Sequence, residues 1–228
     1  MGISTLLLVA SGCGGGGSSP PSPLIAAQGT HYGHTYQDLA GAWWAWALAQ
    51  SYDVNPIVDT DGSFGDAGQP ADVWFLAGTG GGSVDRRIWI PEGRPIFFPL
   101  LNQVWVTFTG IDPPFSTPGA EAAARDAIKM TGLETLTLTI DGVPYGNLLA
   151  YRAQSPVFSV TVPEWNWFDG AANPTAPGVL GAGTYPECVA DGYWAFLNPL
   201  PRGVHTIHFT ADTGAAFTLD VMYEVAIY

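Results

Sequence analysis

The chain has 228 residues, of which 47% are hydrophobic and 12% are charged, so it can bury the core of one large domain. Its formal net charge is −13, and Lys129 is the one lysine; such a surface repels nucleic-acid phosphates and excludes nucleic acid as an expected partner. The 29 glycines and 19 prolines favour many turns and a β-rich fold.

The N-terminus has the features of an export signal followed by a tether. A short apolar run at residues 3–10 cannot span a bilayer, and it ends in Ala-Ser-Gly-Cys at residues 10–13. This ending resembles the lipobox of bacterial lipoproteins, although Ala10 replaces the usual leucine and no basic residue precedes the run. We expect a signal peptide at residues 1–12, lipidation of Cys13, and a Gly/Ser/Pro tether at residues 13–30. The alternative is a glycine-rich cytosolic tail.

These features predict a location in the bacterial cell envelope or outside the cell, with membrane contact only through the lipid anchor. Acylation of Cys13 would leave Cys188 without a partner for an intramolecular disulfide. Cys188 is then either a small buried residue or a free thiol.

Residues 35–50, TYQDLAGAWWAWALAQ, predict an amphipathic aromatic helix. Thr35 and Asp38 suit an N-cap and an acid in the first turn. The three tryptophans, Trp43, Trp44 and Trp46, are a large apolar load, so we expect the helix to pack on a β-sheet. The apolar residues recur at helical spacing: Tyr36, Leu39, Ala40, Trp43, Trp44, Ala47 and Leu48.

The connection that follows, residues 53–70, is polar and rich in glycine. Asp59, Asp61 and Asp66 are spaced closely enough to supply oxygens to calcium, the one cofactor that the sequence suggests. The segment is not an EF-hand, because Phe64 stands at the position of the required glycine and Pro70 at that of the bidentate glutamate. The alternative is a plain turn, since aspartate and glycine are common turn residues.

The rest of the chain alternates short strands with turns. We expect a surface helix at residues 118–130, a hairpin turn at Asp141-Gly142, and prolines that mark an edge or a bulge at residues 95–101. Together these patterns predict one β-sandwich or jelly-roll-like domain over residues 31–228, mainly β, with the aromatic helix beside it. The predicted strands are residues 72–78, 87–90, 95–101, 103–109, 135–141, 157–162, 191–197, 203–210 and 217–227.

The motifs of the mature chain together resemble a family of uncharacterised secreted bacterial proteins. They include WWAWAL, VWFLAG, IPEGRPIFFPLLN, IDGVPYGNLLAYR, VPEWN and DGYWAFLNPLPRGVHTIHF. The resemblance brings no activity. It implies that relatives carry cysteines near residues 63–65 and near Ile88, so that this chain would hold the same two segments together without a disulfide bridge.

The strongest candidate site is the segment VPEWNWFDGAAN at residues 162–173. Trp165 and Trp167 could stack on the apolar face of a sugar ring, while Glu164, Asn166 and Asp169 could bind its hydroxyl groups. Glu164 and Asp169 could also form an acid–base pair for glycoside cleavage. The alternative is that the tryptophans cap the core of the sandwich.

Other chemistry has weaker support. His31 and His34 could chelate a metal with further ligands, whereas His205 and His208 face opposite sides of one strand. No nucleophile, zinc or dinucleotide motif is present in the sequence. Asp141 and Asp191 each precede a glycine and are interpreted as turn residues, and Arg152 could pair with Glu164.

The leading hypothesis is an exported, lipid-anchored binding or structural module of the cell envelope without catalytic residues. Its partner would be a carbohydrate or an envelope protein. The second hypothesis is a glycan-acting hydrolase that uses Glu164 and Asp169.

Overall fold

The computed structural model describes residues 22–168, 181–214 and 217–228. The predicted signal peptide, Cys13, the first part of the tether and Asp169 lie outside these residues. Within them, ten strands form two mixed sheets, accompanied by two α-helices, so the predicted mainly-β, sandwich-like domain is confirmed. No helix among the described residues has the length and apolar character needed to cross a membrane.

The two sheets have five strands each. The first sheet contains β1 (Trp74–Phe75), β3 (Ile96–Val106), β8 (Gly183–Leu197), β6 (Arg152–Gln154) and β7 (Phe158–Val162), the last two pairing with β8. The second sheet contains, in order, β2 (Gly82–Ile90), β10 (Thr218–Ile227), β9 (Gly203–Asp212), β4 (Thr135–Ile140) and β5 (Val143–Pro144).

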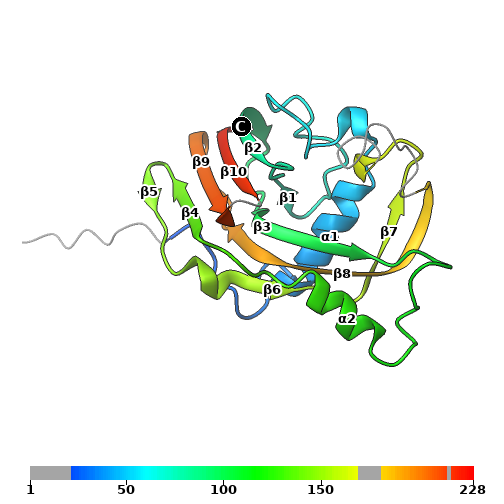
Figure 1. The fold of residues 1–228 in the computed structure, drawn as a ribbon. Coiled ribbons are helices and arrows are strands. Elements are labelled where there is room, and N and C mark those ends of the chain that lie inside the picture. The colour runs from blue at the N-terminus through cyan, green and yellow to red at the C-terminus, as the bar shows by residue number, and fades with distance from the viewer. Residues whose placement is uncertain (1–21, 169–180, 215–216) are drawn as a thin grey trace, which may run out of the picture.

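The first sheet is the middle of three layers. One of its faces packs against the second sheet, and the other packs against α1 (Tyr36–Leu48). Figure 1 shows α1 beside β7 and β8, while β9 and β10 lie away from the helix. Because both faces of β8 are covered, its residues 188–197 are all buried, whereas β10 alternates buried and more exposed residues along its length.

The sequence at the start of α1 explains where the helix begins. The Thr35 hydroxyl accepts from the Asp38 N–H, and the Asp38 carboxylate accepts from the Thr35 N–H, which makes a capping box. The predicted helix is confirmed, but its burial is wider than one amphipathic face, because Gly41 and Trp46 are buried as well. Almost the whole helix is therefore core, packed between the first sheet and the segments that cover it.

Several local predictions are confirmed. The surface helix is α2 (Ala120–Ala127), and two short 3₁₀ helices lie at Tyr52–Val54 and Leu148–Tyr151. Asp141 and Gly142 turn between β4 and β5 with φ of 51° and 75°, the left-handed values that a tight hairpin requires. Pro99 lies at a bulge, since the register between β3 and β8 shifts between Pro99 and Leu101. It also lies where β3 pairs with β8 alone, because β1 pairs only with Ile96 and Phe97.

Other predictions need correction. The segment predicted as a strand at residues 72–78 is buried from residue 73 onward, but only Trp74 and Phe75 form a strand. The strand predicted at residues 191–197 runs from residue 183. The domain also begins before His31, because Leu24 and Ile25 are buried and the Ile25 N–H donates to the Phe196 carbonyl at 2.8 Å.

The interpretation of Asp191 as a turn residue is wrong, and so is the pairing of Arg152 with Glu164. Asp191 is fully buried in β8, and the Arg152 guanidinium binds both of its carboxylate oxygens. The hydrogen bond that Arg152 donates to Asp191 raises the pKa of Arg152. This ion pair joins β6 to β8 inside the fold.

The two segments in which the resemblance places cysteines do lie in contact. The Arg87 N–H donates to the Asp61 carbonyl at 2.8 Å. A Cβ added to Gly65 would come within 2.6 Å of Ile88 Cγ2, so the turn packs directly on β2. Close packing at Gly65 and a backbone hydrogen bond between the two segments therefore hold them together.

Candidate functional site

The predicted aromatic loop follows β7 and sends its two tryptophans to different environments. Trp165 is 40% exposed and lies on the surface. Trp167 is half-buried, packs against the helix-facing core and stacks edge-on to Phe168 with ring centroids 5.1 Å apart. Trp165 is therefore the more exposed of the two rings, and the prediction that both form one sugar-binding surface stays a prediction.

Around Trp165 the structure builds a small surface that we name the Trp165 platform, made of Tyr52, Asp53, Glu164 and Trp165. The Tyr52 N–H donates to the Trp165 carbonyl at 2.9 Å, and the two rings meet edge to face at 5.4 Å. The indole N–H of Trp165 donates to Asp53 Oδ1 at 3.2 Å. These contacts fix the orientation of the indole ring, and the carboxylate of Asp53 lies beside it. Glu164, the preceding residue in the chain, is also exposed.

Trp167 instead lines a cavity of about 140 Å³ that we name the indole pocket. Trp43 and Trp44 of α1 form part of its wall, and Asn102 of β3 lies on it just after the bulge. The residues contributing to the pocket come from six parts of the chain. Together with Trp43, Trp44 and Asn102, the described residues that line it are Ile57, Gly78, Thr79, Gly80, Pro99, Leu100, Leu101, Trp167, Phe217 and Leu219.

The pocket wall contains buried donors without hydrogen-bond partners. Among the described residues, six buried side-chain polar atoms lack a partner, and three of them belong to this wall: Trp44 Nε1, Trp167 Nε1 and Asn102 Nδ2. The buried indoles of Trp43, Trp46 and Trp194 donate to carbonyl groups, Trp43 to that of Leu76 at 2.8 Å, whereas the indole of Trp74, outside the pocket, also lacks a partner. A buried donor left without a partner costs about 1–3 kcal/mol, so three on one wall are unusual for a purely structural core.

The remaining predicted site residues of the loop differ in how far they are exposed to solvent. Asn166 is fully buried; its amide donates to the Pro163 carbonyl and its oxygen accepts from the Phe168 N–H. It therefore shapes the loop instead of facing a ligand. Glu164 is exposed, and the second member of the predicted acid–base pair, Asp169, lies outside the described residues. The hydrolase hypothesis stays a prediction.

The aspartates predicted as calcium ligands shape a turn. Asp59 is buried, and its carboxylate accepts from the N–H groups of Asp61, Gly62 and Phe64 at 2.9–3.1 Å. Asp61 accepts from the Ser63 N–H, and this bond lowers the pKa of Asp61. Asp66 is exposed. The part of the chain that the structure describes contains no group of three or more His, Cys, Asp and Glu side chains placed to hold a metal ion.

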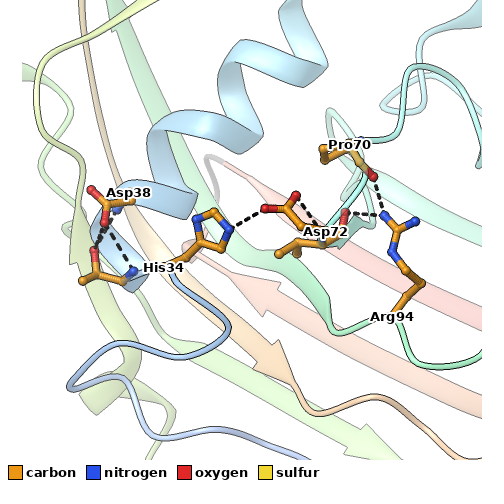
Figure 2. Close-up of polar contacts among 7 residues, drawn as sticks. His34, Asp38, Pro70, Asp72 and Arg94 are labelled. Atoms are coloured by element: carbon orange, nitrogen blue, oxygen red, sulfur yellow. Dashed lines mark hydrogen bonds and ion pairs between the residues drawn. The ribbon is translucent and has the colours of Figure 1, made fainter.

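Three of the four histidines pair with aspartates. Figure 2 shows His34, just before α1, pointing toward Asp72, with Nε2 and Oδ2 2.6 Å apart. The hydrogen bond from His34 lowers the pKa of Asp72. On the far side of Asp72, Arg94 donates to the carbonyls of Pro70 and Val73. This network ties the start of α1 to the segment before β1, and we interpret it as structural.

His205 and His208 pair with Asp141 and Asp220 at 2.8 and 2.7 Å, on opposite faces of β9. The prediction that they do not share one ion agrees with these separate partners. His31 contacts the Gln28 carbonyl at 2.9 Å.

Cys188 is fully buried, so the interpretation as a small core residue is confirmed over that of an exposed thiol. Burial raises the pKa of its thiol from 9.0 to about 12. It therefore stays protonated at neutral pH and is a poor nucleophile.

Sequence reasoning missed most of the residues that these two sites use. Tyr52 and Asp53 lie in a connection, and nothing in their local sequence links them to Trp165. Gly78 ended a predicted strand, and nothing in the local sequence linked it or Gly80 to a pocket. The tryptophans of the helix and of the loop were the available signal for an aromatic site. The sequence does not show that Trp44 and Trp167 line the same pocket.

Searches of protein-family models, curated proteins and solved structures find no match for this chain. The resemblance to uncharacterised secreted proteins stays a prediction, and function has to be argued from the two sites.

Proposed function

We propose that this protein is an exported, lipid-anchored module of the bacterial cell envelope that binds carbohydrate without cleaving it. The observation that supports the binding role is the Trp165 platform. An exposed indole with a fixed orientation offers a flat apolar face to the C–H groups of a sugar ring, and neighbouring carboxylates accept its hydroxyl hydrogens.

The contacts within the platform favour binding over a passive surface role. The hydrogen bond to Asp53 and the edge contact with Tyr52 hold the Trp165 ring in place before a ligand arrives. Less side-chain entropy is then lost on binding, which improves affinity for a given contact area.

A glycan array probed with the full chain tests the binding role. Trp165→Ala should abolish the signal for any glycan that the wild type binds. The control is Trp89→Ala, because Trp89 is 58% exposed on β2 in the other sheet. Equal loss in both variants, or a wild type that binds no glycan, would contradict the proposal.

A separate experiment tests the anchor. Cells that produce the full chain are fed labelled palmitate, and the label should enter the wild type but not Cys13→Ser. Equal labelling of the two proteins, or no labelling of either, would refute lipidation at Cys13.

A further inference from the structure

We propose that the indole pocket is a second binding site, separate from the Trp165 platform. Its ligand is an uncharged, mostly apolar molecule of about one ring in size that carries a hydrogen-bond acceptor oxygen. Size, polarity and charge each restrict the ligand class.

The volume sets the size. The cavity measures about 140 Å³. A dry apolar cavity of about 150 Å³ holds a molecule of the size of benzene. One six-membered ring with a short substituent therefore fills the pocket, whereas a disaccharide or a peptide is too large.

The wall sets the polarity. Trp43, Trp44, Trp167 and Phe217 present aromatic rings to the pocket, which favours a flat apolar ligand. Trp44, Trp167 and Asn102 line the pocket, and each carries a buried N–H group without a partner, so a ligand group that pairs with these donors is an acceptor. A monosaccharide fits poorly, because most of its hydroxyl groups would be buried without partners.

The lack of charged side chains in the described pocket lining disfavours a charged ligand. No charged side chain is among the described residues that line the pocket. The buried guanidinium of Arg86 lies behind the wall, where it donates to the Gly78 carbonyl at 3.0 Å, but its N–H groups are already used by carbonyls and by the Tyr223 hydroxyl. A charged ligand would lose its hydration without gaining a counter-ion.

The pocket and the platform can be tested independently. Trp165, Tyr52 and Asp53 do not line the pocket, and Trp44 and Asn102 do not belong to the platform. Gly80 offers a way to fill the pocket without removing a tryptophan. Its backbone is outside the left-handed region, and a Cβ placed there would sit 3.7 Å from Trp167 Cζ2, which is ordinary contact.

The experiment is isothermal titration of the full chain with acetophenone, a single ring bearing one carbonyl. Ethylbenzene lacks the acceptor, and benzoate and benzylammonium add charge to a ring of similar size. We expect acetophenone to bind at least tenfold more tightly than each of the other three. Equal or tighter binding of ethylbenzene or of either ion would overturn the ligand class, as would binding of methyl glucoside that Gly80→Leu abolishes.

Two variants assign the binding to the pocket. Gly80→Leu should weaken acetophenone binding at least tenfold, while Gly146→Leu, at a glycine with open space around it, should leave the affinity unchanged. In the Trp44→Phe/Trp167→Phe double variant, which keeps both rings aromatic but removes both N–H groups, the preference for acetophenone over ethylbenzene should fall toward one. Unchanged affinity in folded Gly80→Leu, an unchanged preference in the double variant, or a wild type that binds no acetophenone would overturn the proposal.

Discussion

Two buried polar regions meet at Gly78, and they differ in how their donors are used. On one side Arg86 is almost completely buried, and its N–H groups bind backbone carbonyls and the Tyr223 hydroxyl, above whose ring the guanidinium lies. On the other side, the indole pocket keeps donors without partners on Trp44, Trp167 and Asn102.

This difference in hydrogen bonding distinguishes a region that stabilises the fold from a region that we propose binds a ligand. A buried charge whose hydrogen bonds are all made within the protein stabilises one arrangement of the chain, and removing it leaves its partners unsatisfied. Buried donors that find no partner in the protein destabilise it, and on our proposal the three in the indole pocket are retained because a ligand supplies the acceptor. The predictions below test this division, beginning with the largest expected effect.

Arg86→Met should lower the free energy of unfolding by about 4 kcal/mol, because four backbone carbonyls and the Tyr223 hydroxyl lose their donor inside the core. Urea denaturation measures the change. Arg87→Met is the control: Arg87 is exposed and pairs with Glu224 on the surface, so this variant should change stability by less than about 1 kcal/mol. Similar losses of stability in the two variants would contradict the claim that the buried hydrogen bonds of Arg86 stabilise the fold.

Arg152→Met should cost about 3 kcal/mol, because it leaves the buried Asp191 carboxylate without its guanidinium partner. Replacing both members, in Arg152→Met/Asp191→Leu, should recover most of that loss, since no buried charge remains. Denaturation midpoints of the single and double variants measure this difference. A double variant that is less stable than Arg152→Met would show that the pair contributes more than mutual neutralisation.

Trp43 and Trp44 allow the same comparison between neighbours in one helix. Trp43→Phe should destabilise the protein by about 2 kcal/mol, because the Leu76 carbonyl loses its donor and ring volume is lost from the core. Trp44→Phe should cost less than about 1 kcal/mol, because the lost volume is offset by removal of an unsatisfied donor. Thermal unfolding of both variants decides, and a larger cost for Trp44→Phe would contradict the division.

The smallest effect concerns Cys188 and alkaline pH. Its thiol has a pKa of about 12 in the folded protein against an ordinary value of 9.0. The free energy of unfolding therefore keeps the full contribution of the protonated thiol below pH 9 and loses it as the pH rises toward 12. Between pH 9 and pH 10 the wild type should lose about 1 kcal/mol more stability than Cys188→Ala. Identical pH dependence in the two proteins would show that the thiol is not protected by burial.

The sequence predicted the outer parts of the fold better than the middle. Strict alternation along β4, β9 and β10 marks a sheet with one covered face, and those strands were found with nearly correct ends. Residues 188–197 of β8 are covered on both sides, so their apolar run does not alternate, and the start of the strand at residue 183 could not be predicted.

The same limit applies to the sites. The cap at Thr35 and the turn at Asp141 depend on near neighbours in the sequence, and both were predicted correctly. The ion pair of Arg152 with Asp191 and the placement of Trp44 and Trp167 around one pocket depend on contacts between distant segments. Local sequence patterns do not predict such contacts.

The central claim is that the satisfied indoles of Trp43, Trp46 and Trp194 form the frame, whereas the unsatisfied indoles of Trp44 and Trp167 form the binding wall. The unsatisfied indole of Trp74 on β1 does not line the pocket. Nuclear magnetic resonance of the full chain with ¹⁵N-labelled indole groups tests it directly, with signals assigned from single tryptophan-to-phenylalanine variants. On addition of acetophenone, the signals of Trp44 and Trp167 should shift, while those of Trp43, Trp46 and Trp194, which donate to backbone carbonyls, should stay in place. Unchanged signals from Trp44 and Trp167, or equal shifts across all five, would contradict the account.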